Sequence, residues 1–219
     1  GETKAFVYLM NVSIDGIDMS IFEQTYEIVV KWFESRKKGD SELLNEIKVI
    51  FLGNGDVGKT HTIARLMQDG GVPPKSFTGS STPGIIIENK EYLIDGQNVQ
   101  VHFWDFGGQD ILYSMHRMFM TKRTVYVIMV DARNESKSQQ AREWLNTVKS
   151  FAPDAPVMLV INKNDQNPGV TIDETTMMRE YKNNLKRIVY MSALEDSKEL
   201  FRSNFTDALL NIIRESDVL

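Results

Sequence analysis

The run GNGDVGKT at positions 53–60 decides the fold, and it directly follows the apolar run IKVIFL at positions 47–52. It fits the pattern G-x-x-x-x-G-K-[ST], in which backbone N–H groups of a glycine-rich loop surround phosphate oxygens. Lys59 would reach the terminal phosphates, the Thr60 hydroxyl would ligate Mg²⁺, and a helix starting near Gly58 would add its positive dipole end. A chance glycine-rich turn has no reason to end in Lys-Thr. The predicted phosphate-binding residues are Gly53, Asn54, Gly55, Asp56, Val57, Gly58, Lys59, Thr60 and His61.

Composition indicates one globular domain with an appendage. The 219 residues are 42% hydrophobic, which is enough for a substantial core. A net charge of −5 argues against general binding to nucleic acid or acidic membranes. The sequence has no cysteine, so disulfides and cysteine-based zinc sites are excluded. It also has neither an apolar run of about 18 residues nor a signal peptide, so we expect no membrane span and a cytoplasmic protein. The first residue is glycine, which suggests a fragment of a longer chain.

Strand and helix patterns alternate from residue 46 onward, which predicts an α/β fold with helices on both faces of a mostly parallel sheet. The turn sequence DGQN at 95–98 predicts a hairpin, and therefore one antiparallel edge strand. Phe201, Phe205, Ala208, Leu209 and Ile212 form one apolar stripe that we expect in the core. The predicted strands are 46–52, 90–95, 99–105, 124–131, 156–161 and 187–191, and the predicted helices are 58–69, 137–151, 174–184 and 197–214.

Residues 1–45 differ from the rest and form a predicted connector that precedes a nucleotide domain at 46–219. Phe6, Tyr8 and Asn11 fit the spacing of a leucine-rich repeat only loosely, and one copy is weak evidence. An amphipathic helix follows at 22–33. The segment is either a repeat end with a linker helix or an extra helix that packs on the nucleotide domain.

A phosphate loop alone does not choose among ATPases, small-molecule kinases and GTPases, so later motifs must decide. WDFGGQ at 104–109 ends an apolar strand, where Asp105 can hold Mg²⁺ through water. NKND at 162–165 follows another strand, and the Asp165 carboxylate can accept hydrogen bonds from guanine N1–H and the N2 amine, a donor pair that adenine lacks. SAL at 192–194 could add a backbone amide aimed at guanine O6. The predicted guanine-binding residues are Asn162, Lys163, Asp165, Ser192, Ala193 and Leu194.

With these motifs in order, the chain resembles the Ras-like GTPase superfamily over roughly residues 46–215. More narrowly it resembles the Roc domain of the Roco family, on WDFGGQD at 104–110, MHRMFMTKR at 115–123 and VDAR at 130–133. The resemblance implies a Ras-like P-loop fold, Mg²⁺ as cofactor and GTP or GDP as ligand. It also implies leucine-rich repeats before Roc, an adjoining COR domain after it and a homodimer of the full-length protein.

The predicted reaction is Mg²⁺-dependent hydrolysis of GTP by a molecular switch. Gln109 would orient the attacking water, and Lys59 and Gly108 would act on the terminal phosphate. Thr60, Thr82 and Asp105 are the predicted metal residues, with Thr78 and Ser81 as neighbours of Thr82 in a polar loop. The alternatives are an assembly module that binds guanine nucleotide with little hydrolysis, and an ATP-using kinase or ATPase, against which Asp165 argues strongly.

Two departures from the family pattern affect the expected affinity. Asp56 is a carboxylate beside the phosphates and is tolerable only if it points outward, so we expect modest nucleotide affinity. Leu194 replaces a lysine that is usual under the base, which leaves guanine selectivity more dependent on Asp165.

Overall fold

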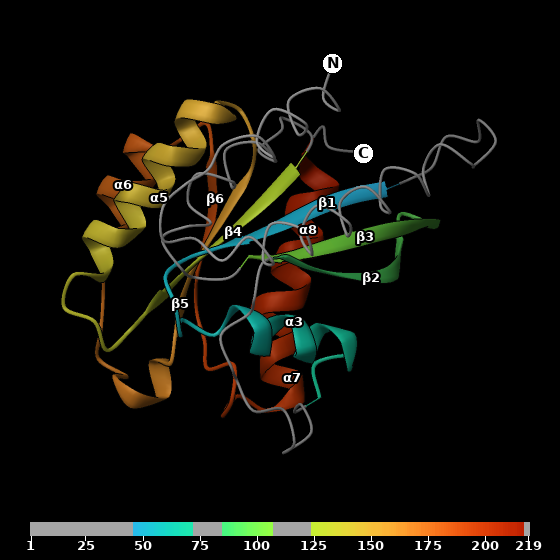
Figure 1. The fold of residues 1–219 in the computed structure, drawn as a ribbon, viewed down its shortest axis with the longest axis horizontal. Helices are drawn as coiled ribbons and strands as arrows, with labels where there is room; N and C mark the ends of the chain where they lie inside the picture. The colour runs from blue at the N-terminus through green and yellow to red at the C-terminus, as the bar shows by residue number, and fades with distance from the viewer. Residues whose placement is uncertain (1–45, 72–84, 107–123, 217–219) are drawn as a thin grey trace, which may run out of the picture.

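The computed structural model describes residues 46–71, 85–106 and 124–216, which form a six-stranded sheet flanked by helices (Figure 1). The strand order is β2-β3-β1-β4-β5-β6. β2 pairs antiparallel with β3 and every other neighbouring pair is parallel, which confirms the predicted sheet. The strands are β1 (Glu46–Leu52), β2 (Ile85–Ile94), β3 (Gln97–Phe106), β4 (Thr124–Asp131), β5 (Val157–Asn162) and β6 (Leu185–Tyr190).

The β2–β3 hairpin is longer than its prediction and its turn is shorter. Asp95 and Gly96 have φ values of 51° and 81°, as a two-residue turn with a left-handed backbone requires. β2 begins at Ile85 rather than at residue 90, because Ile85 pairs with Phe106 at the far end of β3. Ile85, Ile86 and Ile87 are therefore part of the sheet, although the predicted strand began only at residue 90.

The helices follow the predictions with two differences at the C-terminal side. The predicted helix 174–184 ends at Glu180, since the amides of Asn184 and Leu185 bond to the Tyr181 carbonyl and start β6 early. The predicted helix 197–214 contains a π-helical turn, Arg202–Thr206, between two α-helices. The helices are α3 (Lys59–Met67), α5 (Lys137–Phe151), α6 (Glu174–Glu180), α7 (Lys198–Phe201) and α8 (Asp207–Glu215), with a 3-10 turn η2 (Asn164–Gln166).

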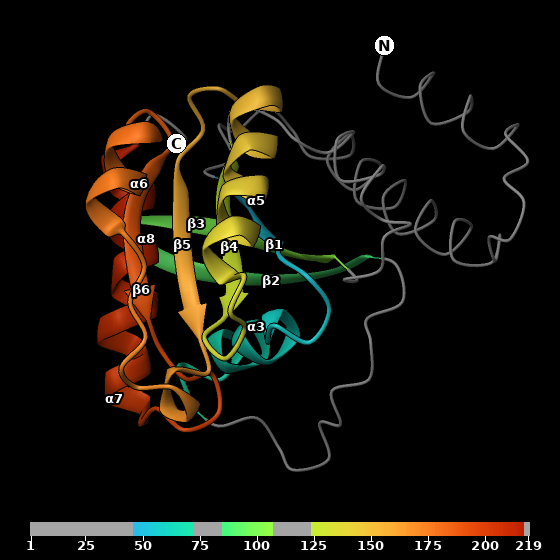
Figure 2. The same ribbon diagram turned by 90° about the vertical axis from the view of Figure 1, so that its left-hand side faces the viewer.

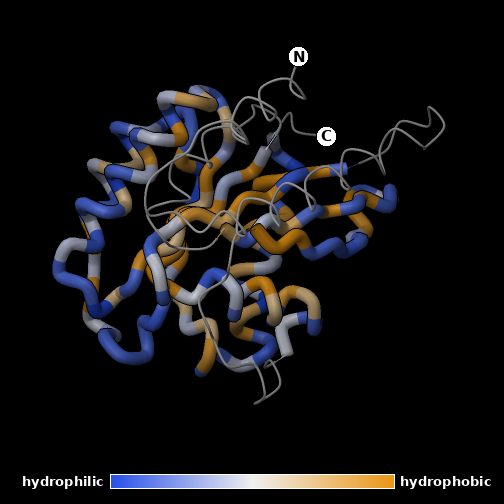
Figure 3. The backbone as a smooth tube through the Cα atoms, viewed as in Figure 1, coloured by the Kyte–Doolittle hydropathy of each residue, from blue (hydrophilic) through white to orange (hydrophobic). Residues whose placement is uncertain are grey.

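Two apolar layers cover the two faces of the sheet. α5 and α6 lie on one face, and α3, α7 and α8 lie on the other (Figure 2). Adjacent residues on β3 divide between them, since Trp104 packs toward the first layer and Phe103 toward the second. β4 and β5 are apolar and buried from Val125 to Val130 and from Val157 to Ile161, as expected for strands whose two faces are both covered (Figure 3). The stripe predicted from Phe201 to Ile212 is buried, which confirms its place in the core.

This layering leaves the carboxyl ends of the parallel strands free to build a site, because the loops after β1, β4 and β5 emerge there side by side. None of the helices in the described ranges is both long and apolar enough to span a bilayer. The predicted connector at 1–45 lies outside the described residues.

Candidate nucleotide-binding site

The loop between β1 and α3 is shaped as a phosphate-binding loop requires. Gly53 and Gly58 have φ values of 144° and 98°, which L side chains rarely adopt. A Cβ atom at Gly53 would lie 2.3 Å from the Met129 carbonyl oxygen, and one at Gly58 would lie 2.3 Å from Asn162 Nδ2. Only glycine fits at these two positions, so the glycine spacing in the sequence reflects close packing of the loop against β4 and β5.

Lys59 is buried inside this loop. Its ammonium group donates to the Gly53 carbonyl at 2.8 Å and to the Asn54 carbonyl at 2.9 Å. Burial lowers the pKa of Lys59 to about 8, and the nearby Asp105 carboxylate acts in the opposite direction. A poorly solvated cation at the centre of the loop is well suited to attract phosphate oxygens.

The residues predicted to hold Mg²⁺ meet between α3 and β3. The Thr60 hydroxyl donates to Asp105 Oδ2 at 2.6 Å, and Asp105 is 2% exposed at the end of β3. A hydroxyl and a carboxylate beside phosphates fit Mg²⁺, which takes few protein ligands and keeps several waters. The described residues contain no cluster of three or more metal-binding side chains. Thr82 lies outside the described residues.

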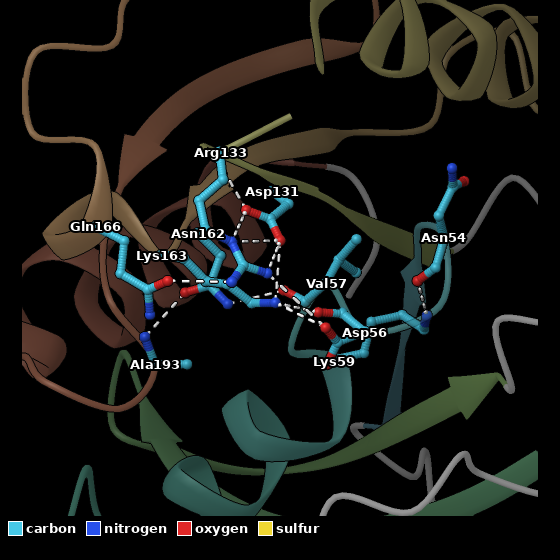
Figure 4. A network of polar contacts seen from close by, with 10 residues as sticks. All are labelled: Asn54, Asp56, Val57, Lys59, Asp131, Arg133, Asn162, Lys163, Gln166 and Ala193. Carbon is cyan, nitrogen blue, oxygen red and sulfur yellow. Dashed lines mark hydrogen bonds and ion pairs between the residues drawn. The ribbon is translucent and has the colours of Figure 1, made fainter. Parts of the chain in front are cut away.

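Asn162 joins three of the predicted motifs. This side chain is 1% exposed and lies at the end of β5. Its Nδ2 donates to the Val57 carbonyl at 2.8 Å, and its Oδ1 accepts from the Ala193 amide at 2.8 Å (Figure 4). Asn162 therefore fixes the phosphate loop and the 192–194 segment relative to each other. The Ala193 amide is therefore engaged by Asn162, so its predicted contact with guanine O6 would have to share this hydrogen and stays a prediction.

Lys163 and Asp56 link the phosphate loop to the NKND segment. Lys163 Nζ donates to the Asp56 carbonyl at 2.5 Å and lies 3.2 Å from its carboxylate. The Asp56 side chain is 91% exposed and so points outward, as its tolerance beside phosphates requires. This outward direction confirms the sequence-based interpretation of Asp56.

Asp131 and Arg133 complete this charge network, and sequence reasoning missed their role. Asp131 accepts from Arg133 Nη2 at 2.7 Å and lies 3.0 Å from Lys163 Nζ (Figure 4). Burial alone would raise the pKa of Asp131, but the hydrogen bonds from Arg133 and Lys163 outweigh it and lower the pKa to about 2. Arg133 also donates to Gln166 Oε1 at 3.1 Å. The sequence VDAR could have indicated this role, because it places Asp131 at the end of β4, next to β5 in the sheet.

The residues predicted to bind guanine lie beside this network. Asp165 is exposed in η2, and within the described part of the chain no group donates a hydrogen bond to its carboxylate, which leaves it able to accept from a base. Ser192 is buried, and its hydroxyl accepts from the Glu195 amide at 3.0 Å. Leu194 is 49% exposed at the predicted base position.

Three further predicted residues are His61, which follows the phosphate-binding loop on α3, and Gly108 and Gln109. His61 is partly buried, and burial lowers its pKa against the opposing charge of Asp56. Gly108 and Gln109 lie outside the described residues. The structure thus brings the described members of the predicted phosphate, metal and guanine groups together at one edge of the sheet.

The sequence matches the family described as Ras of Complex, Roc, domain of DAPkinase over residues 48–165, more than half of the chain. The chain belongs to the Roc family. A solved structure of Methanosarcina barkeri Roco2 RocCORdC bound to GDP is similar to this Roc domain, with a TM-score of 0.65 and 32% identity. That match covers 80% of this chain and 52% of the other. It agrees with the predicted Ras-like fold.

Two Rab-like proteins support the same superfamily. Rab-like protein 2A of Pongo abelii is 28% identical over 134 residues, which are 61% of this chain and 57% of that protein. Rab-like protein 2B of Homo sapiens is 27% identical over 128 residues, which are 58% of this chain and 54% of that protein. The Roc domain therefore spans little more than half the length of the proteins it matches.

Proposed function

We propose that this Roc domain is a switch that binds GTP and GDP with Mg²⁺ and hydrolyses GTP to GDP and phosphate. The observation that carries the proposal is the double hydrogen bond of Asn162 to Val57 and Ala193. It joins the predicted phosphate-binding loop directly to the 192–194 segment that we propose reads guanine. The Roc match and the GDP in the similar Roco2 structure support the same ligand.

Each group has a distinct role in the proposed reaction. The Lys59 ammonium and the loop amides neutralise the negative charge that the phosphates carry in the transition state. Asp165 accepts from the guanine N1–H and N2 amine, which selects GTP over ATP. Thr60 and Asp105 would hold Mg²⁺, which would neutralise part of the phosphate charge. Thr82 as a further metal residue, Gly108 as a phosphate contact and Gln109 as the group that orients water complete the proposal.

The larger setting of the switch is also a proposal. The similar Roco2 structure carries COR beside Roc, and this chain covers only 52% of it. We therefore place this domain in a longer cytoplasmic Roco protein, next to COR and preceded by leucine-rich repeats, and expect that protein to form a homodimer. Nucleotide state would then regulate the neighbouring domains.

Single-turnover hydrolysis tests the proposed reaction. Radiolabelled GTP is mixed with excess protein in Mg²⁺ or EDTA, over a wide range of protein concentration, with ATP as the control nucleotide. We expect slow, Mg²⁺-dependent cleavage of GTP alone, with losses of about 10-fold or more in Thr60→Ala and Gln109→Leu. Cleavage that rises with concentration would show that a second subunit completes the site.

Two outcomes would contradict hydrolysis by this domain. Tight GTP binding without turnover at any concentration would favour the assembly-module function. Turnover of ATP at a rate similar to that of GTP would contradict the role given to Asp165. Arg142→Lys, half-buried on α5 in an ion pair with Glu180 of α6 and outside the nucleotide motifs, is a control that should leave turnover unchanged.

A further inference from the structure

Arg65 is a buried cation that none of the nucleotide motifs includes. It lies on α3, the helix that starts with Lys59 and Thr60, and it has no exposed surface. Its side chain makes six hydrogen bonds, all to backbone carbonyl oxygens. Burial lowers the pKa of Arg65, against the charge of Asp196, so this position has a desolvation cost that an apolar residue would avoid.

One part of the guanidinium binds its own helix end. Nε and Nη2 donate to the Gly70 carbonyl at 3.1 and 2.7 Å, where the chain leaves α3. Gly70 has a φ value of 85°, and a Cβ there would lie 3.2 Å from the Lys198 carbonyl oxygen. The end of α3 is therefore packed closely against the start of α7.

The other part of the guanidinium binds the segment 192–197, more than 120 residues away in sequence. Nη1 donates to the carbonyls of Ser192 at 3.5 Å and Ala193 at 3.3 Å. Nη2 donates to those of Asp196 at 2.8 Å and Ser197 at 3.3 Å. Four of the six bonds thus go to the 192–197 loop, which contains Ser192, Ala193 and Leu194, three of the predicted guanine-binding residues. A residue that only capped α3 would need none of them.

Residue Ala193 is consequently held at both its amide and its carbonyl group. Asn162 accepts from the Ala193 amide at 2.8 Å, and Arg65 donates to the Ala193 carbonyl. The Phe201 ring lies 4.3 Å from the guanidinium carbon and limits its movement. Backbone amides of this loop can point toward guanine O6 only if the loop keeps its orientation. Arg65 therefore acts on the base through the loop and not by touching it.

We propose that Arg65 is a positioning residue for guanine discrimination, which fixes the 192–197 loop to the phosphate-binding helix. The inference rests on the proposed guanine-nucleotide binding of this domain. It concerns the O6 side of the base, whereas Asp165 reads the N1 and N2 side. The two contributions can therefore be separated with a base in which a weaker acceptor replaces O6 while N1–H and the N2 amine remain.

The test compares dissociation constants for GDP and for 6-thioguanosine diphosphate, which keeps N1–H and the exocyclic amine and carries sulfur, a weaker hydrogen-bond acceptor, in place of O6. The variants are Arg65→Lys, whose single ammonium cannot span both groups of carbonyls, and Arg65→Gln, a good helix former that can reach only one group. We expect GDP binding to weaken about fivefold relative to analogue binding, the equivalent of one hydrogen bond. Arg142→Lys, away from the site, should leave the ratio at its wild-type value.

Equal weakening of GDP and the analogue in both Arg65 variants would overturn the inference, since a merely structural role lowers both affinities together. A GDP-to-analogue ratio that stays at the wild-type value would overturn it as well. Failure of the wild-type protein to bind GDP is a different result, because it would contradict the proposed function itself.

Discussion

Asp56 and Lys163 show at the residue scale how the site constrains its own backbone. Their φ values are 60° and 62°, in the left-handed region that costs side-chain-bearing residues roughly 1 kcal/mol. Lys163 bonds to the Asp56 carbonyl, and Asp131 holds the ammonium from the other side at 3.0 Å. Strained residues of this kind cluster at functional sites, and here they bring the phosphate loop and the NKND segment together.

Replacing Asp56 by asparagine should strengthen nucleotide binding. The change removes one negative charge beside the phosphates and keeps a residue type that tolerates the left-handed region. Because the carboxylate is 91% exposed and screened, we expect only a two- to fivefold gain in GDP affinity at low salt, smaller at high salt. Fluorescence titration measures it, with Asp154→Asn, an exposed aspartate before β5, as the matched control. Weaker GDP binding in Asp56→Asn would show that the ion pair with Lys163 matters more than phosphate repulsion.

The lowered pKa of Lys59 predicts a pH dependence of nucleotide binding. In the free protein this ammonium loses its proton above about pH 8, because burial disfavours the charged form. Phosphates favour the charged form and raise the pKa in the complex, so binding should take up a proton in this range. GDP affinity should therefore fall as the pH rises through about 8. Calorimetry in buffers of different ionisation enthalpy measures the proton; release of a proton on binding would contradict the assignment.

At the scale of elements, the C-terminal helix carries much of one core layer through aromatic contacts. The Phe205 ring lies 5.3 Å from Phe201 and 6.3 Å from Phe51, and all three side chains are buried. The π-helical turn Arg202–Thr206 contains Phe205, so the apolar stripe remains buried across the join between α7 and α8. The sequence predicted the stripe, but hydrophobic spacing alone does not distinguish a π turn from a continuous α-helix.

Phe205→Ala should lower the free energy of unfolding by about 3–5 kcal/mol, because it empties a packed site between α7, α8 and β1. Leu200→Ala lies on the same helical segment with 46% of the residue exposed, and it should cost less than about 1 kcal/mol. Urea denaturation of both variants gives the comparison. A similar small loss in both would contradict the place of Phe205 in the core.

At the scale of the whole molecule, short-range patterns predicted more than long-range contacts did. The phosphate loop, the antiparallel edge strand and the motifs at strand ends could be predicted, because each depends on neighbouring residues and on the rule that ligands bind at carboxyl strand ends. The role of Arg65 and the contact of Arg133 with Gln166 could not, since these partners come from other loops, in one case more than 120 residues away. These hydrogen-bond partners reach the two arginines only in the folded protein.

The central claim is that this assembled edge recognises guanine and phosphate together, and calorimetric titration with GDP and ADP in Mg²⁺ tests it most directly. Wild-type protein should bind GDP at least about 10³-fold more tightly than ADP, as expected when a polar site loses both base hydrogen bonds. Asp165→Asn should remove most of that difference. Equal affinity for GDP and ADP in the wild-type protein, or a preference unchanged by Asp165→Asn, would contradict the account.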